Sequence, residues 1–265
     1  MNKKKTLLLT NDDGFFAPGI RYLYDVLCEE YKVIVVAPEK EHSGAGHAFT
    51  FHNPLHYRTI GNEKGMPGYA VSGSPADCVK FAISYLLPAR PDLVVAGMNI
   101  GENSGLSAFY SGTVAAAREG AFWEIPSMAF SVCQQSADNA PRYAEKVPGM
   151  IKNILDAIRG DTTGKNRVFY NVNFPPCTPQ QAKGTRVTWQ SMAFFDDRYE
   201  KVEIESHVSK EGYVIYGEKK NIEPWNTYDS RALMNNYITI TPLTFDSTAH
   251  GALPHLRWLE DCEST

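Results

Sequence analysis

Two adjacent aspartates, Asp12 and Asp13, directly follow an apolar run at residues 6–10 that is typical of a buried strand. Neighbouring carboxylates repel each other, so their position at a strand end needs an explanation. The residue types of Asn11-Asp12-Asp13-Gly14 suit a tight turn, which is one explanation. A bound cation that neutralises both charges is the other, and the pair alone leaves both open.

Two more oxygen donors follow the next strand-like runs along the chain. Ser43 comes after the run at residues 32–37, and Asn99 comes after the run at residues 92–97. Ligands of open α/β sheets bind beyond the carboxyl ends of the strands, so all four side chains meet if these strands are neighbours. Two carboxylates, a hydroxyl and an amide oxygen suit Mg²⁺ or Mn²⁺ better than a structural zinc ion. The sequence therefore predicts a divalent-cation site. The alternative is that the first aspartate caps the turn and the second is solvated.

A glycine-rich loop leads into an expected helix at residues 111–122 and forms a candidate anion site. Free backbone N–H groups and the positive end of the helix dipole make such a helix start suitable for a phosphate. Ser111, Gly112 and Thr113 lie at this start, and the amide of Asn103 could add a hydrogen bond. The alternative is that Ser111 only caps the helix. The sequence has no GxxxxGK[ST] motif, so this is not a Walker-type loop.

A cation beside an anion site indicates phosphoryl chemistry. A divalent metal polarises a phosphoryl oxygen and lowers the pKa of water, and Asp12 or Asp13 could orient that water or accept its proton. A covalent aspartyl-phosphate is a rival mechanism that the residues leave open. A Rossmann-like nucleotide sensor that never turns over its ligand is the alternative function. His42 and His47 lie near Ser43, and we expect both to be exposed loop residues.

The elements that must position these residues alternate between strands and helices. Continuous apolar runs predict buried parallel strands at residues 6–10, 32–37, 92–97, 127–132 and 168–173. Helical patterns lie between them, at residues 19–30, 75–87, 111–122 and 143–159, the last with an expected kink at Pro148. This alternation predicts an α/β fold with a Rossmann-like, doubly wound and mainly parallel sheet.

Two regions do not follow this alternation. Residues 48–72 look extended and contain turn residues, so we expect a β-hairpin insertion there. After residue 184, strand-like segments are separated by charged stretches. We therefore expect a Rossmann-like catalytic core at residues 1–184 and a β-rich C-terminal extension at residues 185–265 that serves oligomerisation.

Composition limits the classes of partner. The 265 residues carry a formal net charge of −4, which argues against a surface for nucleic acid polymers. Five cysteines without a CxxC motif indicate reduced thiols. The first apolar run lacks the length and cleavage site of a signal peptide, and no run reaches the length of a membrane span. We expect a cytoplasmic protein with no membrane or nucleic acid partner.

Seven segments of the chain resemble the signature blocks of the SurE (survival protein E) family of 5′-nucleotidases. The blocks come in the family's order and are TNDDGFFAPGI, APEKEHSGAG, GSPADCVKFAI, AGMNIGENSG, YSGTVAAAREG, NVNFP and YITITPL. The resemblance implies a Rossmann-like core. It also implies a homodimer or homotetramer built partly through the hairpin and C-terminal arms.

The same resemblance implies a phosphomonoesterase for nucleoside 5′-monophosphates, with 3′-monophosphates and short polyphosphate as further substrates. It implies one divalent metal ion per subunit, Mg²⁺ or Mn²⁺. The positions that align with the family's metal ligands are Asp12, Asp13, Ser43 and Asn99. The positions that align with its phosphate-side residues are Asn103, Ser111 and Thr113.

Two positions depart from the family pattern. His42 stands where the family often has arginine, which could change how this loop contacts a phosphate or ribose. Asn236 replaces a glycine that usually precedes the YITITPL strand. Asparagine tolerates a positive φ, so we expect the turn to be kept.

Overall fold

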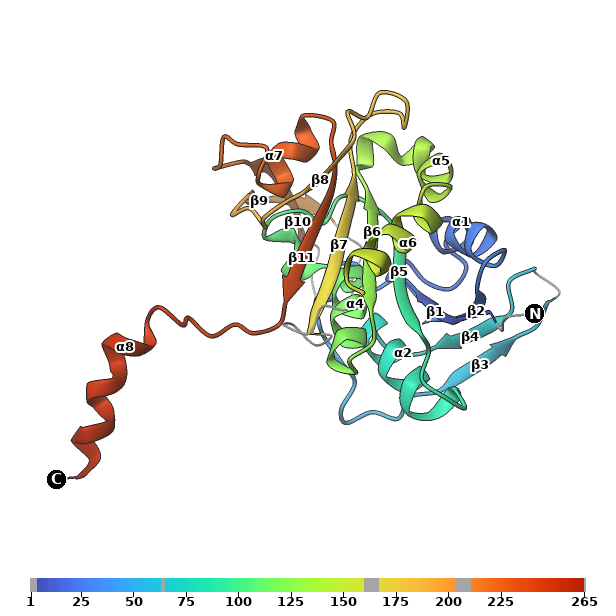
Figure 1. Ribbon diagram of the computed structural model, residues 1–265, viewed down its shortest axis with the longest axis horizontal. Coiled ribbons are helices and arrows are strands. Elements are labelled where there is room, and N and C mark those ends of the chain that lie inside the picture. Colours follow the sequence, from blue (N-terminus) through green and yellow to red (C-terminus); the bar gives the residue numbers. More distant parts are fainter. Residues whose placement is uncertain (1–3, 63–64, 160–166, 204–210, 265) are drawn as a thin grey trace.

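The computed structural model describes residues 4–62, 65–159, 167–203 and 211–264. Its main sheet has nine strands within these ranges, in the order β3-β4-β2-β1-β5-β6-β7-β11-β8 (Figure 1). The strands are β1 (Thr6–Thr10), β2 (Lys32–Pro38), β3 (Tyr57–Ile60), β4 (Gly68–Val71), β5 (Leu93–Ile100), β6 (Ser127–Val132), β7 (Val168–Phe174), β8 (Thr185–Val187) and β11 (Ile238–Thr244). The predicted α/β class with a mainly parallel sheet is confirmed.

Strand β1 lies in the middle of the parallel part of the sheet. It pairs in parallel with β2 on one side and with β5 on the other. Its side chains alternate between two cores, because Leu7 and Leu9 pack on one face and Leu8 packs on the other. Burial on both faces explains why this strand reads as a continuous apolar run. It also brings the chain segments after β1, β2 and β5 to the same edge of the sheet.

Helices cover both faces of the sheet (Figure 1). One layer contains α1 (Pro18–Leu27), α5 (Ala140–Ala144) and α6 (Val147–Ala157), and the opposite layer contains α2 (Pro75–Phe81) and α4 (Gly112–Phe122). Shorter helical pieces are η2 (Ala82–Leu86), α3 (Ser107–Tyr110) and η3 (Gln134–Asn139). In the described ranges, no helix combines the length and the apolar character that a membrane span requires.

The expected helix at residues 143–159 is wrong as a single element. The chain forms α5 and then α6, with the break before Val147, and Pro148 lies in the first turn of α6. A proline there removes an N–H group that has no partner inside the helix, so it starts a new helix rather than kinking an existing one. The start of α2 is confirmed, because Ser74 and Asp77 form a reciprocal capping box.

The expected hairpin within residues 48–72 consists of the antiparallel strands β3 and β4. Strand β4 also pairs in parallel with β2, so the hairpin widens the main sheet. After residue 184, β8 and β11 join the main sheet as well, and β11 runs antiparallel to β7. The division of the chain at residue 184 stays a prediction.

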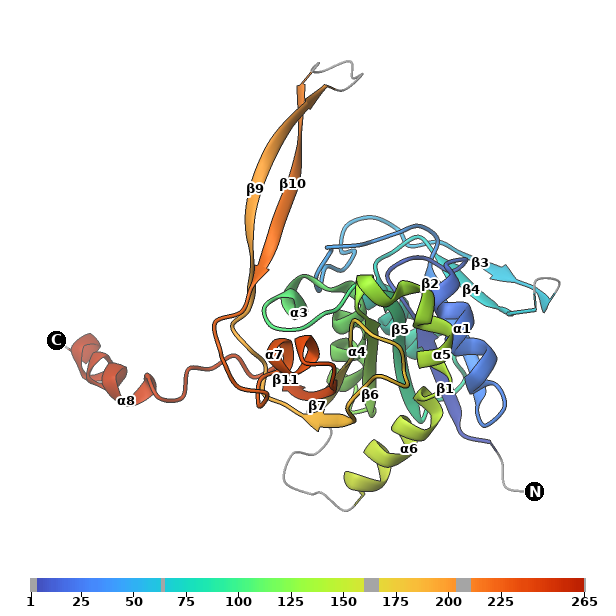
Figure 2. The same ribbon diagram turned by 90° about the horizontal axis from the view of Figure 1, so that it is seen from above.

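The other two strands after residue 184 form a separate hairpin. Strands β9 (Phe194–Glu203) and β10 (Glu211–Lys220) pair with each other and stand away from the body (Figure 2). The helical pieces of this region are α7 (Asp229–Met234), α8 (Leu253–Leu256) and η4 (Arg257–Ser264). Asn236, which precedes β11, has a φ of 66°, as the sequence predicted.

Candidate active site at the carboxyl edge of the sheet

The segment after β1 forms a tight turn that buries Asp12. Gly14 has a φ of 102°, and the side chain of Asn11 donates to its carbonyl oxygen at 2.9 Å. The turn thus accounts for the asparagine and the glycine. It does not account for Asp12, whose residue surface is only 4% exposed. A carboxylate that merely suited a turn would remain in water.

The start of helix α4 holds the carboxylate of Asp12. The hydroxyl of Thr113 donates to Asp12 Oδ1. Burial raises the pKa of Asp12, and hydrogen bonds from Thr113 and from the backbone of Gly112 offset part of this rise. A Cβ atom on Gly112 would lie 2.8 Å from Cβ of Asp12, so only glycine allows this close approach. The helix start is therefore packed directly against the aspartate.

Asp13 is half-buried beside Asp12. Burial raises its pKa to about 7, and the charges of Asp12 and Glu41 contribute to the rise. In the described part of the chain, no ion pair joins either aspartate to a lysine, arginine or histidine. The two carboxylates therefore repel each other, and no ion pair among the described residues offsets the repulsion.

Three of the four predicted metal ligands line one cavity of about 290 Å³, which we call the carboxyl-edge cavity. They are Asp12, Ser43 and Asn99, while Asp13 is not among the described residues that line it. The amide nitrogen of Asn99 donates to Gly101 O at 2.7 Å. The amide oxygen of Asn99 is therefore the atom that could coordinate a metal ion. The exposed hydroxyl of Ser43 donates to Glu41 Oε1 at 2.7 Å.

The predicted phosphate-side residues divide into two groups. Asn103 and Ser111 line the carboxyl-edge cavity. Ser111 also accepts a hydrogen bond from Val114 N at 3.1 Å, so it caps α4 as well. Gly112 and Thr113 contact Asp12 instead. For these two residues the structure offers a role in positioning the aspartate, and their contact with a phosphate stays a prediction.

The side chains that hold Asn103 were missed in the sequence. The amide nitrogen of Asn103 donates to Ser131 Oγ at 2.8 Å, its backbone N–H donates to Asn173 Oδ1 at 2.7 Å, and Asn171 donates to its carbonyl oxygen at 2.7 Å. Asn171 and Asn173 are two positions apart on β7, so they share one face of the strand. Two asparagines at this spacing in a buried strand are the signal that could have found them.

Among the other residues that line the carboxyl-edge cavity, four with polar or aromatic side chains were also missed, namely Glu102, Ser107, Tyr110 and Phe195. The expectation for His47 was wrong. Its ring lies 3.0 Å from Glu119 Oε2 and stacks on Phe122, so it is a half-buried structural residue. His42 is half-buried, and its backbone N–H donates to Asp12 O at 2.7 Å.

The chemistry of this donor set fits a hard divalent cation. Among the described residues, no group of three or more His, Cys, Asp and Glu side chains could hold a metal ion. The candidate ligands differ from such a group, because they combine the carboxylates of Asp12 and Asp13 with the hydroxyl of Ser43 and the amide oxygen of Asn99. Such oxygen-only sets suit Mg²⁺ or Mn²⁺. A cation would also relieve the repulsion that raises the pKa of Asp13.

Comparisons with known proteins identify the family of this chain. The family model described as "Survival protein SurE" matches residues 7–197. A protein named 5′-nucleotidase SurE from Flavobacterium psychrophilum is 37% identical, covering 96% of each chain. Its namesake from Syntrophobacter fumaroxidans is 38% identical, covering 95% of this chain and 98% of its own.

A solved structure gives the same result. The crystal structure of the SurE protein from Aquifex aeolicus matches with a TM-score of 0.76 and 34% sequence identity, covering 96% of this chain and 99% of that one. The chain therefore belongs to the SurE family.

Proposed function

We propose that this protein is a metal-dependent phosphomonoesterase that hydrolyses nucleoside 5′-monophosphates to nucleoside and phosphate. The observation that carries the proposal is the buried Asp12 beside Asp13, without a protein cation, at a cavity that Ser43 and Asn99 also line. A pure phosphate binder would gain nothing from two carboxylates facing an anion. The activity in the names of the SurE relatives supports the same conclusion.

The residues of the site would have separate roles in metal binding and in positioning the metal ligands. Asp12, Asp13, Ser43 and Asn99 would hold one divalent ion, Mg²⁺ or Mn²⁺. When bound, this ion supplies positive charge that polarises a phosphoryl oxygen and makes a nearby water more acidic. Thr113 holds the carboxylate of Asp12 in place through its hydrogen bond.

The protein groups around the ion bind the phosphate and handle the proton. Asn103 and Ser111 line the cavity and present polar groups to a phosphate ester. Either Asp12 or Asp13 would accept a proton from the attacking water, and Asp13 is the more exposed of the two. Attack by an aspartate on phosphorus is the rival mechanism, and mass spectrometry of enzyme trapped with phosphate analogues would detect its covalent intermediate.

The proposal extends to substrate range, assembly and location. We include 3′-monophosphates and short polyphosphate as further substrates, and a homodimer or homotetramer as the assembly. Exposed side chains support an assembly role for the region after residue 184, among them Tyr213 and Ile215 of β10 and Trp258 of η4. The free thiols Cys28, Cys78, Cys133 and Cys177 support a cytoplasmic location.

One experiment tests the reaction class and the substrate range together. Phosphate release is measured for 5′- and 3′-monophosphates of each nucleoside and for short polyphosphate, with Mg²⁺, Mn²⁺, Ca²⁺, Zn²⁺ or EDTA. We expect activity with Mg²⁺ or Mn²⁺ and none in EDTA. Full activity in EDTA would contradict the metal requirement. Calorimetric binding of nucleotides without phosphate release under every metal would indicate the nucleotide sensor instead.

A further inference from the structure

The base of the β9–β10 hairpin reaches the carboxyl-edge cavity, although most of the hairpin stands away from the body (Figure 2). Phe195 on β9 lines this cavity. Lys219 is its direct partner on β10, and the Lys219 ammonium lies 5.7 Å from the centroid of the Phe195 ring. The base of the hairpin therefore places an aromatic ring and a cation beside the site.

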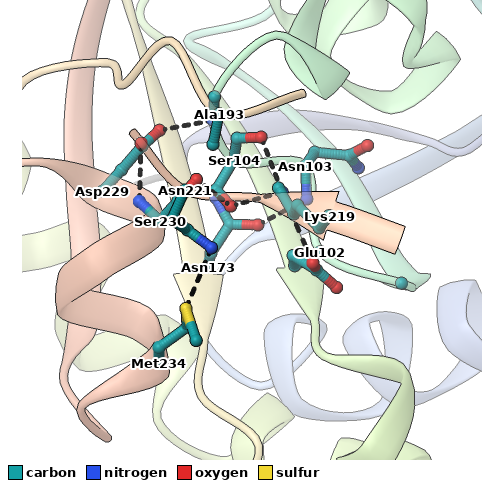
Figure 3. Close-up of polar contacts among 12 residues, drawn as sticks. Glu102, Asn103, Ser104, Asn173, Ala193, Lys219, Asn221, Asp229, Ser230 and Met234 are labelled. Carbon is teal, nitrogen blue, oxygen red and sulfur yellow. Dashed lines mark hydrogen bonds and ion pairs between the residues drawn. The ribbon is translucent and has the colours of Figure 1, made fainter. Parts of the chain in front are cut away.

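Lys219 is bound into the body of the protein. Its ammonium donates to the carbonyl and hydroxyl oxygens of Ser104, both at 2.8 Å, and lies 3.4 Å from Glu102 Oε1 (Figure 3). Its side chain is only 13% exposed. The next residue, Lys220, is 47% exposed and pairs with Glu218 of its own strand. Of these two neighbouring lysines, only Lys219 connects the hairpin to the site.

The loop at residues 102–105, which Lys219 holds, includes two cavity residues, Glu102 and Asn103. Its other side is fixed by buried groups around α7, because Ser230 Oγ donates to Ser104 Oγ at 3.0 Å and Gly105 N donates to Asp229 Oδ2 at 3.0 Å (Figure 3). Lys219 completes this hydrogen-bond network from the hairpin side. Charge-assisted hydrogen bonds at a mostly buried ammonium are strong, so they fix the loop as well as the strand.

The aromatic residues of the cavity lie where a nucleoside would extend from a bound phosphate. Ser111, near the buried aspartate, is 6% exposed, whereas Phe195 and Tyr110 are 44% and 70% exposed. When the phosphate of a nucleotide binds among the buried polar groups, its nucleoside extends toward these exposed rings. An aromatic ring stacks on any nucleobase, since every base has a π-face.

We propose that the base of the β9–β10 hairpin forms the nucleoside side of the active site. Phe195 contacts the nucleobase, and Lys219 is a positioning residue that holds both Phe195 and the 102–105 loop. This proposal rests on the proposed nucleotidase function. It adds the hairpin to the site and gives the enzyme a means of preferring nucleotides over simpler phosphate esters.

The role of Phe195 is tested with two substrates that differ only in the base. The value of kcat/KM is measured for adenosine 5′-monophosphate and for ribose 5-phosphate, in the wild type, in Phe195→Leu and in the neighbouring control Phe194→Leu. We expect Phe195→Leu to lower kcat/KM for the nucleotide about tenfold, mainly through KM, and to lower kcat/KM for ribose 5-phosphate much less. The control should change neither value.

Two results would separate this proposal from the proposed function. If Phe195→Leu affected both substrates equally, or neither, the contact between Phe195 and the base would be refuted while the nucleotidase function stood. If the wild type released no phosphate from any nucleotide with any divalent metal, the proposed function itself would fail.

The role of Lys219 is tested with Lys219→Met and the matched control Lys220→Met. We expect Lys219→Met to lower kcat about tenfold for both substrates, because the 102–105 loop loses its support, and to raise KM for the nucleotide further. Lys219→Arg should recover part of both losses, since it keeps the charge. Thermal melting confirms that each variant is folded. Equal kinetics for Lys219→Met and Lys220→Met would overturn the positioning role.

Discussion

Two nearly buried carboxylate sites in this chain differ in how their charge is balanced. Glu119 on α4 is 2% exposed, and Asp12 is 4% exposed. Glu119 lies 3.0 Å from His47, 3.1 Å from the Lys80 ammonium and 3.0 Å from the Trp123 ring nitrogen. Burial alone would raise its pKa, but these partners outweigh burial and lower it.

The surroundings of the two sites show the same contrast. Glu119 lines a second cavity, of about 450 Å³, whose other described residues include the cations Lys80 and Arg118. The carboxyl-edge cavity has no such cation among its described lining residues, and the pKa of Asp12 is raised. The chain therefore pairs Glu119 with its own cations, whereas no ion pair balances the two candidate aspartates in the described residues. A buried carboxylate at a cavity whose pKa is raised is a candidate functional group, whereas a lowered pKa is typical of a carboxylate held in a structural ion pair.

The largest expected effect on hydrolysis comes from Asp12→Asn. We expect phosphate release to fall about 10³-fold, since the site loses one of its two carboxylates. The same change removes a buried, repelled charge. The metal-free variant should therefore have a higher free energy of unfolding than the wild type. Kinetics and urea unfolding in EDTA measure the two effects. Unchanged phosphate release in Asp12→Asn would show that hydrolysis does not need the Asp12 carboxylate, which would contradict the contrast with Glu119.

Metal binding should separate the two sites in a stability measurement. Mn²⁺ at about 100 times its Kd should stabilise the wild type by about 2.7 kcal/mol, which raises Tm by several degrees. Glu119→Gln should keep this shift, and Asp12→Asn should lose most of it. Thermal melting with and without Mn²⁺ measures the shift. A full shift in Asp12→Asn would place the ion elsewhere.

A smaller effect on hydrolysis is expected from Thr113→Val. The two side chains have the same shape, and Thr113 is fully buried, so the change removes only the hydroxyl that bonds Asp12. We expect kcat/KM to fall about tenfold, which corresponds to about 1.4 kcal/mol, the order of one charge-assisted hydrogen bond. Thr188→Val, which removes another buried threonine hydroxyl far from the aspartates, is the control. Equal losses in the two variants would argue against a positioning role for Thr113.

The smallest effect on hydrolysis, within about twofold, is expected from Glu119→Gln, although the fold should lose about 1–3 kcal/mol of unfolding free energy. The loss should depend on pH. Because the folded-state pKa of Glu119 lies below its unfolded value, its contribution is full above about pH 4.5 and disappears as the pH falls through the folded pKa. Unfolding of wild type and variant at pH 7 and pH 3 measures the difference. A difference that grew toward low pH would contradict this assignment.

Much of the fold and half of the site could be predicted from local sequence. The apolar runs gave the buried strands, Ser74 gave the start of α2, and Asn236 gave the turn before β11. The residues after β1 and β2 and at the end of β5, which continues past the predicted residue 97 to include Asn99, could be placed together because ligands of such sheets bind at the carboxyl edge. That prediction needs only strand order, which alternating strands and helices restrict strongly.

The remainder depended on contacts between distant parts of the chain. Nothing local in the sequence around Phe195 and Lys219 shows that Phe195 lines the carboxyl-edge cavity or that Lys219 contacts Glu102, 117 positions earlier. His47 looked like an exposed loop residue because its partner Glu119 lies 72 positions away. Thr113 looked like a phosphate ligand because a helix start suits any anion, and the anion it contacts is the chain's own Asp12.

The antiparallel pairing of β11 with β7 has a consequence for biosynthesis. Residues 175–237 separate the two strands, so β7 has no partner on that side until the ribosome has made almost the whole chain. During this interval the nascent protein presents an unpaired strand edge, which is a surface for association with other chains. Truncation before Ile238 would make that state permanent. Folding of the sheet is therefore completed only by the last strand to leave the ribosome.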